Sequence, residues 1–121
     1  MWNMLIVGAG GAAGAMGRYG ISLLPWKGDF PLLTLATNLL GAILIGFVVG
    51  LSEHGTGNSG WTMFWKTGVC GGFTTFSTFS LESVALFQKG HWLLGASYGI
   101  LSVGLCLLGV IVGRKLADML R

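Results

Sequence analysis

The segment from Gly71 to Ser80 holds the densest run of side chains that could do chemistry, and it reads GGFTTFSTFS. Hydroxyl groups donate hydrogen bonds, and the edges of phenylalanine rings carry the positive end of the ring quadrupole. Phe76 and Phe79 are three residues apart, so in a helix they share one face. Hydroxyl donors and ring edges together suit a small anion, although a structural phenylalanine pair is the usual reason for this spacing. The hydroxyl residues of the segment are Thr74, Thr75, Ser77, Thr78 and Ser80.

The first half of this segment is poor helix sequence. Two glycines are followed by β-branched and hydroxyl residues, which disfavour a helix interior. Non-helical backbone within a membrane is tolerated only inside protein or beside water, and broken helices of transporters offer free carbonyls to cations and amides to anions. We therefore expect a break near residues 71–74. The alternative is a continuous glycine-rich helix whose hydroxyls bond to carbonyls four residues earlier.

Other polar side chains interrupt apolar stretches. Asn38 follows Thr34 and Thr37 in such a stretch, and an amide that faces lipid is costly, so it should face protein or water. Its plainer role is a hydrogen bond between helices. A second polar stripe, with members four residues apart, consists of Tyr98, Ser102 and Cys106.

Two charged residues lie closest to the apolar stretches, namely Arg18 and Glu82. Each side chain is either an anchor that reaches toward the membrane surface or a part of an electrostatic vestibule.

The elements that position these residues follow from composition. Charged residues make up 9% of the 121-residue chain, against about 25% in a soluble domain. Hydrophobic residues make up 53% and the mean hydropathy is +0.76, so a soluble globular domain is excluded. The basic residues are scattered, which argues against nucleic-acid binding. The two cysteines lie in apolar segments, which argues against a disulfide and against a cysteine metal site.

The distribution of charge predicts the fold class. Apolar stretches long enough for one span each, at about 20 residues per span, alternate with short loops. The stretches at 32–52 and 92–113 are uncharged, whereas the first contains Arg18 and the third contains Lys66 and Glu82. The sequence predicts an all-α integral membrane protein, one transmembrane domain over residues 1–121, with four transmembrane helices near 3–24, 32–52, 61–87 and 92–113. Short loops make neighbouring helices antiparallel. No cleavable signal peptide is evident.

The basic residues do not favour one orientation in the membrane. One side of a four-helix chain would hold Arg114, Lys115, Arg121 and, at the edge, Lys66; the other would hold Arg18, Lys27 and Lys89. Orientation depends on an imbalance of such residues. The near balance predicts dual topology, in which oppositely inserted copies pair as an antiparallel homodimer. A weak bias toward one orientation is the alternative.

Three stretches of the chain resemble the Fluc/CrcB family of fluoride ion channels. The stretches are GGAAGAMGRY at 10–19, Thr34 to Asn38 with Gly41, and GVCGGFTTFSTF at 68–79. The resemblance implies a dual-topology homodimer with two antiparallel fluoride pores. It also implies a structural Na⁺ at the dimer interface, held by the backbone carbonyls of Gly71 and Thr74.

The resemblance also assigns roles to side chains. It places the rings of Phe76 and Phe79 along the pores, together with the polar side chains of Asn38, Ser77 and Thr78. It places Arg18 in a vestibule, and Tyr98 and Ser102 on a polar track along the last helix. Leu33, Thr37 and Cys106 depart from the family's usual residues.

The function expected from this likeness is passive export of fluoride through a selective channel in the cell inner membrane, not an enzymatic reaction. One alternative is a small dual-topology, proton-coupled exporter of drugs or cations. That exporter needs an intramembrane carboxylate, and Glu82 is the only candidate. A second alternative is a membrane-assembly subunit that transports nothing, which would leave the GGFTTFSTF cluster unexplained.

Overall fold

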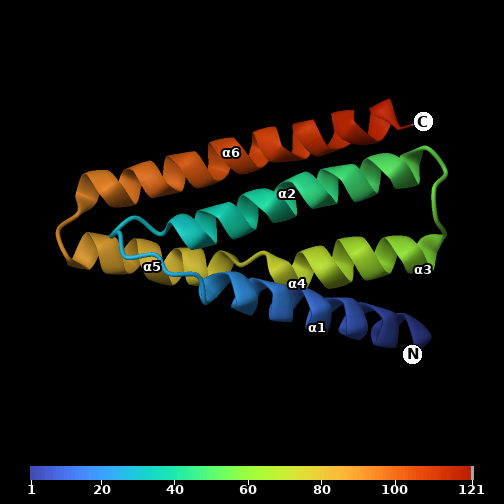
Figure 1. Ribbon diagram of the computed structural model, residues 1–121, viewed down its shortest axis with the longest axis horizontal. Coiled ribbons are helices and arrows are strands. Elements are labelled where there is room, and N and C mark those ends of the chain that lie inside the picture. The colour runs from blue at the N-terminus through green and yellow to red at the C-terminus, as the bar shows by residue number, and fades with distance from the viewer. Residues whose placement is uncertain (121) are drawn as a thin grey trace.

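The computed structural model describes residues 1–120, which are helical apart from short connections (Figure 1). Two helices come first in the chain and one comes last, and between them lies a helical run in four pieces that we call the third run. The elements in order are α1 (Trp2–Ser22), α2 (Leu32–Glu53), the third run of α3 (Ser59–Thr62), η1 (Met63–Cys70), α4 (Gly71–Phe73) and α5 (Phe76–Gln88), and finally α6 (Trp92–Met119). The η1 piece is a π-helix.

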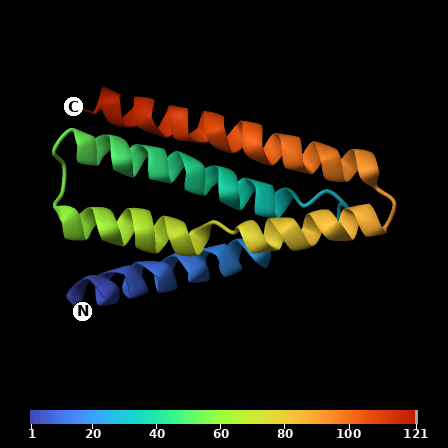
Figure 2. The ribbon, with the colours of Figure 1, turned by 180° about the vertical axis from the view of Figure 1, so that it is seen from behind.

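The helices lie side by side and alternate in direction. The third run lies between α1 and α2, and α6 covers the other side of α2 (Figures 1 and 2). Both chain ends lie at the same end of the bundle, together with the connection from α2 to α3. This is the arrangement that four antiparallel helices with short connections must adopt.

Packing within the bundle is closest in two pairs, α1 with η1 and α4, and α2 with α6. Glycines permit both approaches. A Cβ atom added to Gly10 would lie 2.9 Å from the Cα atom of Gly68, and one added to Gly113 would lie 2.7 Å from the backbone nitrogen of Phe47. Real Cβ atoms do not approach so closely, so small residues let these backbones touch.

The third run is interrupted at Thr74 and Thr75. Thr74 has φ −81° and ψ 154°, and Thr75 has φ −146° and ψ 115°, so both residues are extended. The helix restarts at Phe76 because the Thr75 side chain accepts a hydrogen bond, 3.1 Å long, from the Thr78 backbone N–H. Such a cap satisfies one of the N–H groups that a helix start leaves without a partner.

The outer surface of the protomer is apolar. Leu93 and Met4 are 83% and 77% exposed, and many other large hydrophobic side chains are exposed with them. Within residues 1–120, α2 and α6 are long and apolar enough to cross a membrane. A small core, formed by Leu35, Leu86 and Tyr98, joins α2, α5 and α6.

Candidate functional site

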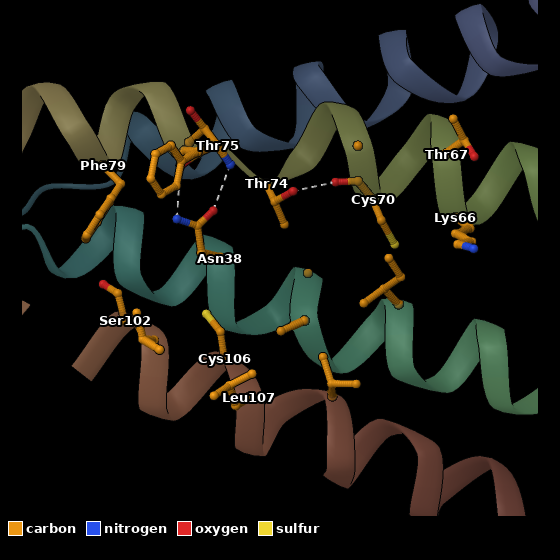
Figure 3. Close-up of a pocket in the computed structure, with 17 residues that line it drawn as sticks. Asn38, Lys66, Thr67, Cys70, Thr74, Thr75, Phe79, Ser102, Cys106 and Leu107 are labelled. Atoms are coloured by element: carbon orange, nitrogen blue, oxygen red, sulfur yellow. Dashed lines mark hydrogen bonds between the residues drawn. The ribbon is translucent and has the colours of Figure 1, made fainter. Parts of the chain in front are cut away.

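A cavity of about 660 Å³ lies between α2, the third run and α6 (Figure 3). Four of the side chains expected from the sequence to line a pore border it, together with the two residues expected to offer carbonyls to a cation. These are Asn38, Phe76, Phe79 and Ser102, and Gly71 and Thr74. Among the described residues that line this cavity, Lys66 is the one that carries a charge.

Asn38 ties α2 to the interruption of the third run. Its side-chain oxygen accepts a hydrogen bond from the Thr75 backbone N–H, 2.8 Å away. Its side-chain nitrogen donates to the Thr75 carbonyl over 3.1 Å. Figure 3 shows both bonds reaching from α2 to the extended residue. Asn38 therefore has the interhelical role that its sequence position left open, and it faces the cavity as well.

This pairing changes the hydrogen bonding of the preceding turn. In a continuous helix the Thr75 N–H would donate to the Gly71 carbonyl, but here it donates to Asn38. The Gly72 carbonyl accepts from the Arg18 Nε atom instead, at 3.2 Å. The Cys70 carbonyl accepts from both the backbone N–H and the side-chain hydroxyl of Thr74. The interruption thus frees the Gly71 carbonyl from its helical donor.

Gly71 and Gly72 have different surroundings. A Cβ atom on Gly72 would lie 3.0 Å from the Cα atom of Gly11, whereas one on Gly71 would have no atom of this chain within 4 Å. Gly72 is therefore required by packing inside the protomer. Gly71 is open, on the face of the third run that borders the cavity.

The hydroxyl groups at the start of α5 form a cluster around the Thr75 side chain. The Thr75 hydroxyl donates to the Thr78 hydroxyl at 3.0 Å and lies 3.3 Å from that of Ser77. Thr78 also borders a second, smaller cavity of about 70 Å³, which Arg18 lines from α1. Thr75 borders both cavities. Ser77 lines neither of these two.

The two phenylalanines differ in their burial. The ring of Phe79 packs on that of Tyr98, with centroids 4.9 Å apart. Phe76 is 79% exposed, and its ring centroid lies 5.5 Å from that of Phe79. Tyr98 is fully buried, and its hydroxyl donates to a Glu82 carboxylate oxygen at 2.9 Å. The Phe79 ring is thus fixed by its own chain, while most of the Phe76 surface is free.

Ser102 and Cys106 face the cavity from successive turns of α6 (Figure 3). Ser102 is 9% exposed, and its buried hydroxyl has no hydrogen-bond partner within residues 1–120. A buried hydroxyl without a partner is uncommon in folded proteins. It is therefore available to donate to a small acceptor in the cavity.

Thr75 is the residue of this site whose importance the sequence did not reveal. It connects both cavities, the hydroxyl cluster and the Asn38 bonds. The available signal was its position as a threonine just before the α5 helix, where a capping side chain is favoured. Its bond to Asn38 spans 37 residues of sequence and has no local signal.

Comparisons with known proteins identify the family of this chain. The sequence profile of the family described as "CrcB-like protein, Camphor Resistance (CrcB)" matches residues 5–114. A protein of Ruminiclostridium cellulolyticum named "Fluoride-specific ion channel FluC" is 46% identical over 121 residues, covering 97% of this chain and 93% of its own. Proteins of the same name from Clostridium perfringens and Rhizobium meliloti are 46% and 44% identical, each over 120 residues and 96% of this chain, and over 94% and 96% of their own lengths. The chain therefore belongs to the CrcB-like family.

Proposed function

We propose that two copies of this chain form a fluoride-selective channel that lets fluoride leave the cytoplasm passively. The observation that carries the proposal is the cavity between α2, the third run and α6, where an amide, a buried hydroxyl and two phenylalanine rings border one space. The name of the relatives supports fluoride as the ion.

Fluoride is strongly hydrated, so entry into a narrow path requires hydrogen bonds that replace those of water. The Asn38 amide nitrogen carries two N–H groups and uses one on the Thr75 carbonyl, which leaves the second to donate. The unpartnered Ser102 hydroxyl supplies another donor. Neither group carries charge, so each holds the anion weakly, which conduction through successive sites requires.

The two phenylalanine rings lie beside these donors. Ring edges are electropositive. The Phe76 and Phe79 rings are inclined by 43° to each other, so the two rings are not stacked face to face. We assign both edges to the fluoride path. Phe79 is held against Tyr98, which fixes one wall of the path.

The remaining polar residues have supporting places in this proposal. Arg18 borders the smaller cavity with Thr78, where it would form the vestibule. Thr78 and Ser77 surround the Thr75 hydroxyl and would supply donors next to the rings. Tyr98, held by Glu82, would begin the polar track that continues to Ser102 on α6.

A passive pore is sufficient for export. Hydrogen fluoride is a weak acid that crosses membranes as a neutral molecule and dissociates in the cytoplasm. The fluoride anion left behind is driven outward by an inside-negative potential, at about 2.3 kcal/mol per charge for 100 mV. No energy source beyond the membrane potential is needed.

The proposed channel is a homodimer because the protomer leaves part of its site open. Phe76 is 79% exposed, a Cβ atom on Gly71 would meet no other described segment of its own chain within 4 Å, and both residues border the same cavity. A second copy, inserted in the opposite direction as the charge balance predicts, would cover this face. Two such copies would give two antiparallel pores.

Dual topology has a direct test. In cells, a C-terminal tag should be accessible from both sides of the membrane within one population. A tag accessible from one side only would exclude the antiparallel pairing. We also propose that the four helical rows span the cell inner membrane. The apolar outer surface of the protomer supports this placement.

A structural Na⁺ fits the interruption of the third run. The Gly71 carbonyl has lost its helical donor to Asn38, and Gly71 lies on the open face. Carbonyls of Gly71 and Thr74, supplied twice by a two-fold axis, would form an oxygen cage, which hard cations prefer. When bound, the ion would hold the two copies together by attracting carbonyl oxygens from both of them.

The alternative exporter needs a carboxylate that exchanges protons in the substrate path. Glu82, the candidate, accepts a hydrogen bond from the Tyr98 hydroxyl, and it borders a different cavity of about 240 Å³ with Trp26 and Lys89. The fluoride channel is therefore favoured over the exporter.

Ion release from liposomes tests the proposed function. Purified protein should release fluoride rapidly, with chloride far slower, because chloride is larger and a weaker hydrogen-bond acceptor. Comparable fluoride and chloride release would reject selectivity. Uptake of a lipophilic cation driven by a proton gradient would favour the exporter, and no flux of any ion would favour an assembly subunit.

A further inference from the structure

Lys66 is the charged residue of the main cavity, and neither the fold nor the proposed pore accounts for it. It lies in η1, with Thr67 beside it, and both side chains are exposed. Figure 3 places Lys66 and Phe79 at opposite ends of the cavity.

Lys66 has no acidic partner among residues 1–120. The two ion pairs found there are Arg114 with Glu53 and His54 with Asp118. Glu82 accepts a hydrogen bond from Tyr98 and borders a different cavity. The Lys66 charge is therefore not neutralised within the described part of the protomer, and it remains available to an anion.

The other basic residue near the pore is engaged differently. The Arg18 Nε atom donates to the Gly72 carbonyl. The Arg18 guanidinium therefore also stabilises the turn before the interruption. Lysine, by contrast, carries a compact charge with three donors on a flexible stem. A charge of this kind collects anions without binding them tightly.

The local backbone is consistent with a special role. Lys66 lies within a π-helical segment of eight residues, Met63–Cys70. π-Helical turns are rare and frequently occur at functional sites. They displace the side chains that follow, and here the cavity-lining residues include Lys66, Thr67, Cys70 and Gly71.

We propose that Lys66 is the anion-capturing residue at the mouth of the cavity, which raises the local fluoride concentration ahead of the uncharged donors. The inference rests on the proposed fluoride channel and adds a residue to it. Charge at the entrance of a cleft accelerates association with an opposite charge, and salt weakens this effect with a screening length of about 10 Å at 0.1 M. Capture limits flux at low fluoride concentration and not at saturation.

The test measures initial fluoride release from liposomes for the parent, K66M, K66R and K115M. Lys115 lies on α6 outside the cavity and serves as the matched control. Fluoride is varied at constant Na⁺, with potassium gluconate added to change ionic strength. At low fluoride and low salt, K66M should be slower by about tenfold, while K66R and K115M should match the parent. The difference should shrink at high fluoride and at high salt.

Three results would overturn this assignment. K66M could match the parent at low fluoride and low salt, or lose the same fraction of flux at every fluoride concentration, which would indicate a structural role. A parent protein that releases no fluoride would reject the proposed channel, and the role of Lys66 with it. If K66M does not assemble as a dimer, K66Q carries the same comparison.

Discussion

The Asn38 side chain bonds both the N–H and the carbonyl of Thr75, so one amide engages both backbone groups of the residue that caps α5. This pairing sets the extended conformation of Thr75 and removes the donor that would otherwise occupy the Gly71 carbonyl. The amide thus determines the shape of the site as well as one of its donors.

Replacing Asn38 by leucine, which has a similar shape, should leave the Thr75 N–H without a partner and remove one bond to the Thr75 carbonyl. The expected loss in the free energy of unfolding is about 1–3 kcal/mol, measured by thermal unfolding in detergent. Thr37→Val is the matched control. The Thr37 hydroxyl donates to the Leu33 carbonyl of its own helix, so the Thr37→Val change should cost less than about 1 kcal/mol. Equal losses in both variants would contradict the Asn38 assignment.

Adding a methyl group should affect dimerisation at Gly71 and the stability of the protomer at Gly72. Gly72→Ala should lower the unfolding temperature of the protomer, because its Cβ atom would press on Gly11. Gly71→Ala should leave the protomer folded and reduce the dimer fraction, and Gly71→Val should abolish flux. Size-exclusion chromatography and crosslinking report the dimer. Normal dimerisation of Gly71→Val would remove this residue from the interface.

Phe76→Ile and Phe79→Ile separate packing from conduction. Phe79→Ile should cost about 1 kcal/mol, since it loses ring contacts with Tyr98. Phe76→Ile should cost little in the protomer, where the side chain is 79% exposed. If ring edges contact fluoride at the barrier, a loss of about 1.4 kcal/mol slows release about tenfold in either variant. Parental flux in assembled variants would return both rings to a packing role.

Removal of sodium should weaken the dimer. Replacing Na⁺ by N-methyl-D-glucamine should lower both the unfolding temperature and fluoride flux. Raising free Na⁺ to 100 times its dissociation constant should restore about 2.7 kcal/mol. Thr74→Ser keeps the carbonyl and should behave like the parent. A dimer that conducts equally without Na⁺ would exclude the structural ion.

The sequence is informative about elements and less so about what they touch. Sparse charge and long apolar stretches predict the positions of the helical rows, and the Gly-Gly-Phe-Thr-Thr order predicts a weak helix close to the extended residues Thr74 and Thr75. Both properties are local, so composition and helix propensity report them.

Contacts between distant segments have no such local signal. Phe76 and Phe79 share one helix face, yet the first is exposed and the second packs on Tyr98, because α6 covers only part of that face. The Asn38–Thr75 bonds depend on how α2 meets the third run. The π-helical geometry of η1 has no counterpart among the sequence predictions.

The pairing of α1 with η1 and α4, and of α2 with α6, also affects synthesis. When α1 and α2 have left the ribosome, neither has yet met its main partner. Gly10 of α1 packs against Gly68, and Phe47 of α2 packs against Gly113 near the end of the chain, and both glycines are synthesised later. The two pairings interleave along the sequence, so neither half of the chain can complete its packing alone. A ribosome that stops before α6 therefore releases a chain in which α2 lacks its largest interface, which is the state that membrane quality control would meet.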